Sequence, residues 1–140
     1  MRTIALISCV KTKRNRPCKA KDMYISPLFK ESYEYASKRC DKIYILSARY
    51  GLIEDDRMIS PYQETLNDKT IHERKIWSIG VLKSLSLRCD LSKDQFLLLG
   101  GANYMRYIKQ KIKYFEDPLQ GLSLGMRISL LKKYNENGKE

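Results

Sequence analysis

The stretch Thr3-Ile4-Ala5-Leu6-Ile7-Ser8-Cys9 is a near-continuous apolar run of strand length. Strands covered on both faces, as in parallel sheets, have this pattern, whereas half-exposed strands alternate apolar and polar residues. The segments at residues 42–48 and 95–99 have the same character, and segments with helical apolar spacing separate the strands. This order of elements predicts a parallel sheet with right-handed crossovers.

The predicted helices cover residues 28–39, 70–87 and 102–113, followed by a short basic helix at 127–134. Pro27 suits the start of the first helix, and Asp68 or Thr70 could cap the second. The fold class we expect is therefore α/β, a three-layer Rossmann-like domain with a small, mainly parallel sheet flanked by helices.

The chain has 140 residues, which is the length of one domain. We expect residues 1–134 to form a single α/β domain and residues 135–140 a frayed polar tail. Residues 49–67 contain Gly51, Pro61 and a run of charged side chains, which predicts a long loop. Loops of this length in compact domains are usually functional or disordered.

The composition, 43% apolar and 31% charged, is that of a folded globular protein. The apolar runs are too short to cross a bilayer, and the N-terminus lacks the features of a signal peptide, so we expect a cytoplasmic protein that does not bind membranes. Four cysteines without a Cys-x-x-Cys pair, and a single histidine, indicate reduced thiols. We predict no metal site and no cofactor.

The net charge of +11 is large for this length and favours a polyanionic partner. The partner we expect is a nucleic acid, DNA in the first place, or a nucleotide; the alternative is a lysine-rich surface without a specific ligand. Much of the charge lies at residues 11–21 and 106–113. The oligomeric state is not predicted.

The candidate site is the crevice at the carboxyl ends of the three predicted strands, where open parallel sheets bind ligands. All three ends carry small, hydroxyl or cationic residues. Such residues suit an anion or a polar planar ligand. The predicted site residues are Ser8, Cys9, Lys11 and Lys13 after the first strand, Ser47, Arg49, Tyr50 and Gly51 after the second, and Gly100, Gly101 and Tyr104 after the third.

Two glycines before a helix let a phosphate approach the free amides of its first turn, although glycines also simply end strands. Lys11, Lys13 and Arg49 could clamp phosphate oxygens, or be ordinary surface charges. Tyr50, Tyr62 and Tyr104 could stack on a base, or pack in the core.

The nearest acidic candidates for general acid or base catalysis lie in the predicted long loop. The candidate catalytic set is Arg49, Asp55 and Glu64, with Glu54 and Asp56 nearby, and a solvated acidic loop is the alternative. Cys9 with His72 as its base would be a nucleophile pair, but a buried structural thiol is the better interpretation because nothing in the sequence brings His72 close.

Several short motifs occur in the order typical of one family. They are Ser8-Cys9-x-Lys11-x-Lys13, Tyr24-x-Ser26-Pro27-Leu28-Phe29, Ile45-Leu46-Ser47-Ala48-Arg49-Tyr50-Gly51-Leu52, Pro61-Tyr62-x-x-Thr65-Leu66, Gly100-Gly101-x-x-Tyr104 and Pro118-Leu119-x-Gly121-Leu122-x-Leu124-Gly125. Over nearly its full length the chain resembles the short relatives of the YaaA-like peroxide-stress proteins. The resemblance implies a Rossmann-like fold and an association with DNA or with nucleobase modification.

Two departures from the family pattern matter. The position after Tyr62 is often acidic in the family but is Gln63 here, which weakens the case for a catalytic carboxylate there. The extra helices with which larger relatives are thought to grip DNA are also missing. We predict an enzyme that acts on a nucleobase or nucleoside, by N-glycosidic cleavage or a related step. The alternatives are a non-catalytic DNA-binding or DNA-protection protein and a nucleotide-binding sensor.

Overall fold

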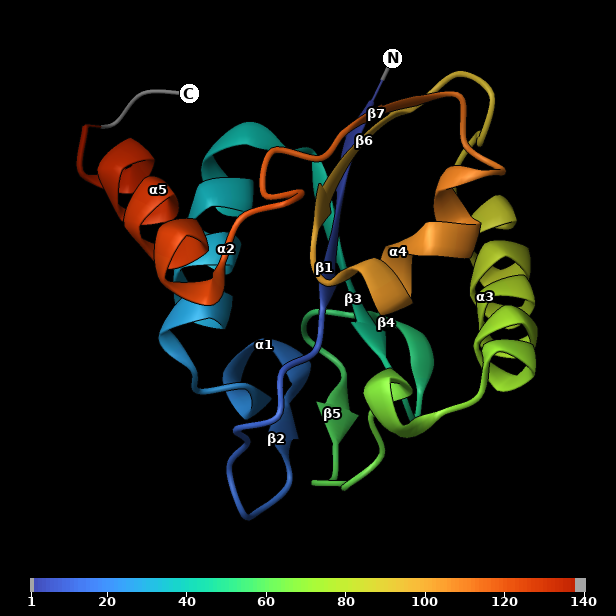
Figure 1. Ribbon diagram of the computed structural model, residues 1–140, viewed down its shortest axis with the longest axis horizontal. Coiled ribbons are helices and arrows are strands. Elements are labelled where there is room, and N and C mark those ends of the chain that lie inside the picture. Colours follow the sequence, from blue (N-terminus) through green and yellow to red (C-terminus); the bar gives the residue numbers. More distant parts are fainter. Residues whose placement is uncertain (1, 138–140) are drawn as a thin grey trace.

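Five strands form one sheet in the order β4-β3-β1-β6-β7 in the computed structural model, which describes residues 2–137 (Figure 1). The strands β1, β3, β6 and β7 run parallel, and β4 is antiparallel to β3. Helices cover both faces of the sheet, so the predicted α/β, Rossmann-like fold class is confirmed. The strands are β1 (Thr3–Ser8), β3 (Lys42–Ser47), β4 (Gly51–Glu54), β6 (Gln95–Leu99) and β7 (Tyr114–Glu116).

The central strand is β1, the stretch whose apolar run indicated the fold. Ile4, Ala5 and Leu6 are completely buried, because β3 and β6 pair with β1 on its two sides and helices cover both faces. A strand in this position exposes neither face to water, which is why its sequence does not alternate.

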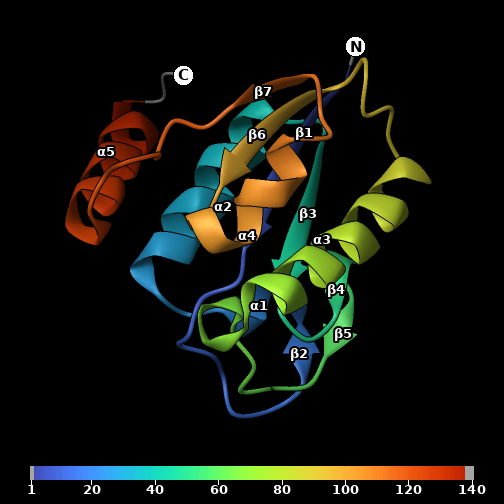
Figure 2. The same ribbon diagram turned by 45° about the vertical axis from the view of Figure 1, so that its right-hand side comes forward.

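Two pairs of helices cover the sheet. Figure 2 shows α3 (Ile71–Ser86) and α4 (Ala102–Lys109) together on one face, while α2 (Pro27–Arg39) and α5 (Leu124–Asn137) lie on the other. Ser26 caps α2 by accepting a hydrogen bond from the Phe29 amide, and Thr70 caps α3 in a capping box with Glu73. Of the two predicted caps for α3, Thr70 is the one observed.

The long loop predicted over residues 49–67 contains regular structure, so that prediction is wrong in part. Gly51 has a φ of +73°, which only glycine adopts readily, and it turns the chain from β3 into β4. A second small strand, β5 (Met58–Ile59), pairs with β2 (Cys18–Lys19), and the 3₁₀ helix η1 (Leu66–Asp68) follows. With α1 (Ala20–Met23), β2 and β5 lie beyond the carboxyl ends of β1 and β3 (Figure 1).

The C-terminal boundary also differs from the prediction. Helix α5 continues to Asn137, and Asn135, assigned to a frayed tail, is buried with its side-chain amide bonded to Glu31 on α2 at 2.9 and 3.0 Å. Residues 138–140 lie outside the described part of the chain. Strand β7 was not predicted, because its three residues are exposed at the sheet edge and carry no apolar pattern.

None of the helices within residues 2–137 combines the length and the apolar character that crossing a membrane requires. In the same part of the chain, no three histidine, cysteine or acidic side chains come together as a set of metal ligands.

Candidate functional site

The strand order places a crevice beside β1. From β1 the chain crosses to β3 on one side and later returns to β6 on the other, so the loops that follow β1 and β6 diverge at their carboxyl ends. A pocket of about 170 Å³ opens there, which we call the inner pocket. It is lined by Ile7, Ser8, Cys9, Val10, Leu28, Phe29, Ser32, Asn67, Leu99, Gly100, Gly101, Tyr104, Leu119 and Arg127.

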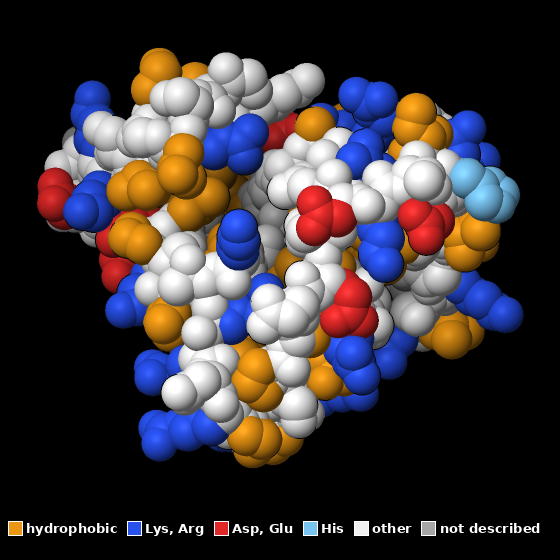
Figure 3. Space-filling view, turned by 60° about the horizontal axis from the view of Figure 1, so that its bottom comes forward, with side chains coloured by type: hydrophobic (Ala, Val, Ile, Leu, Met, Phe, Trp, Pro, Cys, Tyr) orange, Lys and Arg blue, Asp and Glu red, His pale blue; other side chains and the backbone are white. Residues whose placement is uncertain are grey.

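A second, wider hollow of about 710 Å³ adjoins the inner pocket, and we call it the outer cleft. Four residues line both, so the two form one continuous site whose outer part has the size of typical small-molecule sites, about 300–1,000 Å³. Figure 3 shows lysine, arginine and acidic side chains intermixed on this face of the molecule. The outer cleft is lined by Cys9, Val10, Lys11, Lys13, Gln63, Glu64, Thr65, Asn67, Asp68, Tyr104 and Leu124.

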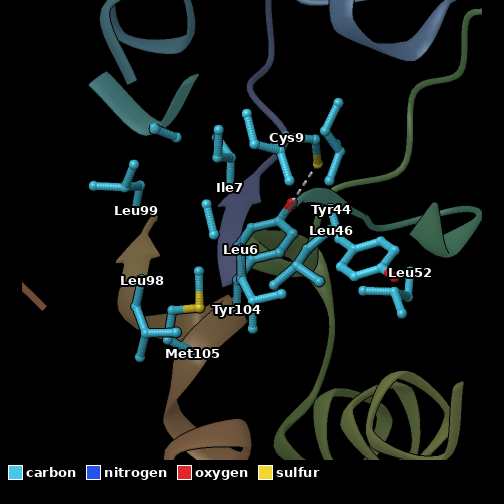
Figure 4. Packing of buried hydrophobic residues seen from close by; sticks show 14 of the residues in the cluster. Leu6, Ile7, Cys9, Tyr44, Leu46, Leu52, Leu98, Leu99, Tyr104 and Met105 are labelled. Carbon is cyan, nitrogen blue, oxygen red and sulfur yellow. Dashed lines mark hydrogen bonds between the residues drawn. The ribbon is translucent and has the colours of Figure 1, made fainter. Parts of the chain in front are cut away.

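Tyr104 lies at the junction of the two parts. Its hydroxyl accepts a hydrogen bond from Cys9 Sγ at 3.3 Å (Figure 4). It also accepts one from the Leu66 amide at 3.3 Å and lies 3.4 Å from the hydroxyl of Thr65. The ring of Trp77 packs edge-on against it. Burial raises the pKa of the Tyr104 phenol, so the group is neutral at physiological pH. Tyr104 therefore lines the site as a fixed polar wall.

Cys9 is buried and bonded to Tyr104, as expected for a structural thiol. His72 lies at the exposed start of α3 and lines neither the inner pocket nor the outer cleft. The alternative of a Cys9–His72 nucleophile pair has no support from this geometry.

Two predicted site residues shape the chain and do not line the cleft. The Ser47 hydroxyl accepts hydrogen bonds from the amides of Arg49 and Tyr50, at 3.2 and 2.9 Å, and its carbonyl accepts one from Trp77 Nε1. Gly51 provides the positive φ of the next turn. Both fix the end of β3, so their contribution to a site is indirect.

The two glycines after β6 have different roles. A Cβ on Gly100 would lie 2.3 Å from Ser8 Oγ, so Gly100 lets the ends of β1 and β6 meet. A Cβ on Gly101 would meet nothing within 4 Å, and Gly101 caps α4 without a side chain. Both glycines line the inner pocket, and Gly101 is the one whose backbone has no close neighbour on its Cβ side.

Two of the three predicted aromatic residues contact other parts of the chain and do not line the site. Tyr62 is buried, its hydroxyl 2.6 Å from that of Tyr24, and Lys13 Nζ lies 4.5 Å from its ring centre. Burial lowers the pKa of Lys13, although Glu64 acts in the opposite direction. Tyr50 bonds to the backbone of Ser60 outside the cleft. Of the three tyrosines predicted to stack on a base, Tyr104 is the one that lines the site.

Of the two acidic residues in the candidate catalytic set, Glu64 lines the site and Asp55 does not. Glu64 lines the outer cleft, and its carboxylate forms an ion pair with Arg49 at 3.1 Å. Desolvation alone would raise the pKa of Glu64, but hydrogen bonds from nearby backbone amides and the Arg49 guanidinium outweigh it and lower the pKa. Asp55 instead accepts a hydrogen bond from Tyr33 on α2 at 2.6 Å and lines neither part of the site. Arg49 does not line the outer cleft and acts on it through its ion pair with Glu64.

Sequence reasoning missed six polar residues that line the site. Ser32 lies on α2 and Arg127 on α5, and the others come from the segment that leads into and forms η1: Gln63, Thr65, Asn67 and Asp68. Arg127 donates to the carbonyls of Leu122 at 3.0 Å and Gly100 at 3.4 Å. A search of the strand ends alone does not find such residues; the Gly-x-Arg at the start of the last helix was the one available signal.

Comparison with known proteins gives one match. A family model described as "Family of unknown function (DUF6884)" matches residues 4–133, which include every residue of the inner pocket and the outer cleft. No curated protein and no solved structure matches the chain.

Proposed function

We propose, for a chain that belongs to the DUF6884 family of unknown function, that the strand-end site binds a nucleotide or nucleoside and cleaves its N-glycosidic bond. The observation that carries this proposal is Glu64, a carboxylate at the wall of the outer cleft that is ion-paired with Arg49 at 3.1 Å, in a cleft that the phenol of Tyr104 also lines.

The chemistry requires a group that stays ionised and faces the sugar. Glu64 accepts a proton from a water molecule while the water oxygen bonds to the anomeric carbon. The carbon–nitrogen bond breaks, its electron pair leaves with the base, and the base takes up a proton from solvent. The negative charge of Glu64 also stabilises the positive charge that develops on the sugar. Arg49 positions the carboxylate and is not itself a catalytic residue.

Lys11 and Lys13 give the outer cleft a cationic side that suits an anionic substrate. Four free cysteines agree with work in the reducing cytoplasm, and a relationship to the YaaA-like proteins agrees with nucleic-acid metabolism. The cytoplasmic location and the relationship to the YaaA-like proteins both belong to this proposal.

A non-catalytic protein that binds DNA is the second candidate, and the net charge of +11 favours it. Binding of that kind depends on many phosphate contacts, so its affinity falls steeply with salt and responds to several lysine substitutions rather than to one carboxylate. A nucleotide sensor would use the cleft without turnover.

The test is incubation of the purified chain with DNA, RNA, nucleotides and nucleosides, normal and modified, followed by mass spectrometry. We expect release of a free base by the wild type and a loss of at least a hundredfold in rate for Glu64→Gln. The matched control is Glu34→Gln, since Glu34 is also exposed and ion-paired, with Lys38 at 3.2 Å, but lies on α2 outside the site. If no substrate releases a base, or if both variants are equally active, the enzymatic proposal is wrong.

A further inference from the structure

We infer that the inner pocket is a phosphate subsite, so that the substrate of the proposed reaction is a nucleoside 5′-monophosphate rather than a free nucleoside or a polymer. This inference rests on the proposed function for the identity of the ligand, but the pocket itself stands on its own geometry.

Two largely buried serines present free hydroxyls to the inner pocket. Ser8 is 7% exposed and Ser32 is 2% exposed, both line the pocket, and neither side chain forms a hydrogen bond to another residue of the described chain, 2–137. Neither oxygen is sealed from solvent, since the fully buried side-chain atoms without a partner in that part of the chain are Asp117 Oδ1 and Asn135 Oδ1. The two hydroxyls are therefore open to the pocket and can donate to the oxygens of a ligand.

The backbone supplies further donors at the same place. Ser8 Oγ is aimed at the Gly100–Gly101 turn, within 2.3 Å of where a Gly100 Cβ would be. The amide of Gly101 forms no backbone hydrogen bond in the described chain, and α4 begins at the next residue without a side-chain cap. The first amides of a helix lack intrahelical acceptors and attract anions.

The charges separate the two parts of the site. Arg127 is the one charged side chain among the residues that line the inner pocket. The lining of this pocket contains no aspartate or glutamate. The outer cleft instead contains Glu64 and Asp68 beside its lysines. In the outer cleft the two carboxylates offset the charges of Lys11 and Lys13, so a phosphate is attracted more strongly to the inner pocket. The apolar walls of the inner pocket strengthen this attraction by excluding water.

The geometry therefore orients the substrate. The phosphate binds in the inner pocket, the sugar passes Tyr104 at the junction, and the anomeric carbon and base lie in the outer cleft, where Glu64 is found. The internal phosphates of a polymer are diesters flanked by further nucleotides, so they fit a small phosphate subsite less well than a terminal monophosphate does. Specificity for a terminal monophosphate follows from the small volume of the inner pocket, about 170 Å³.

Isothermal titration calorimetry with ribo- and deoxyribonucleoside 5′-monophosphates, the matching nucleosides and inorganic phosphate tests the inference. We expect at least one monophosphate to bind tenfold or more tightly than its nucleoside, and inorganic phosphate to compete with it. Gly101→Pro removes the amide and Ser32→Ala the hydroxyl, and each should weaken monophosphate binding about tenfold without weakening nucleoside binding. The matched control is Ser37→Ala, which removes a serine hydroxyl from the same helix α2 at a position that lines neither the inner pocket nor the outer cleft.

Equal affinities for monophosphates and nucleosides, or monophosphate binding that neither Gly101→Pro nor Ser32→Ala weakens, would overturn the inference. Thermal unfolding of each variant shows whether its fold is intact, and Ser8→Ala replaces any variant that fails this check. The outcome is separable from that of the proposed reaction. Monophosphate binding without base release supports the subsite and contradicts the glycosidase; equal cleavage of nucleosides and monophosphates does the reverse.

Discussion

Gly100 and Ser8 are in such close contact that a Cβ on Gly100 would lie 2.3 Å from Ser8 Oγ and 2.6 Å from Ser8 Cβ. This contact joins the loops that leave β6 and β1, and the two loops form one wall of the inner pocket. The packing of the sheet end and the shape of the candidate site therefore depend on the same pair of residues.

Gly100→Ala should destabilise the protein by about 1–3 kcal/mol, because the new methyl group overlaps Ser8 and also meets Met105 Cε at 2.9 Å. Gly101→Ala, one residue along, should change the free energy of unfolding by less than about 0.5 kcal/mol, since its Cβ meets nothing. Urea denaturation of both variants checks this pair. Equal stabilities would show that the strand ends separate easily.

Tyr104→Phe should cost about 1–3 kcal/mol of stability, because the lost hydroxyl leaves the buried Leu66 amide and Cys9 without their partner. The matched control is Tyr107→Phe on the same helix, whose hydroxyl has no hydrogen bond within the described residues. Denaturant unfolding measures both. A neutral Tyr104→Phe would mean that water replaces the phenol, and that the junction of the two pockets is wet.

The sheet could be predicted from the sequence because burial on both faces leaves a mark that needs no tertiary information. The strand predicted at 95–99 matches β6, and those predicted at 3–9 and 42–48 each exceed β1 and β3 by one residue. Strands β2, β4, β5 and β7 were missed, since each has four residues or fewer and is fixed by its neighbours rather than by its own pattern.

The site was predicted in part for a similar reason. Residues that follow buried strands, such as Cys9, Lys11 and Gly101, line it because the topology brings strand ends together. Ser32 and Arg127 lie on helices whose packing against the sheet end no local pattern reveals. Asp55 shows the converse: its position in the predicted loop suggested the site, but β4 carries the chain away from it.

Asn135→Ala should lower the free energy of unfolding by about 1–2 kcal/mol, because the Asn135 amide donates to the carbonyl and carboxylate of Glu31 and attaches α5 to α2. Asn137→Ala, in the exposed last turn of the same helix, should change it by less than about 0.5 kcal/mol. Thermal unfolding of both variants is the measurement. If neither variant changes the free energy of unfolding, the contact between Asn135 and Glu31 does not help to hold α5 on α2.

The ion pair between Arg49 and Glu64 should set the acid limb of the pH profile. The guanidinium contributes to the lowered pKa of Glu64, so the carboxylate stays ionised as the pH falls below the usual range for glutamate. Arg49→Ala removes this contribution, and the pKa of Glu64 should rise. Because the ionised form is the active one, activity should then be lost at a higher pH than in the wild type.

Arg57→Ala is the matched control for this shift. Arg57 and Arg49 both lie over the ring of Tyr50, at 5.3 and 5.7 Å from its centre, but only Arg49 contacts Glu64. Carbon-detected NMR titration of the glutamate carboxyls follows the pKa directly and does not depend on a known substrate. A Glu64 pKa that is the same in Arg49→Ala as in Arg57→Ala would show that the ion pair is too solvated to tune the carboxylate, and Arg49 would lose its role as a positioning residue.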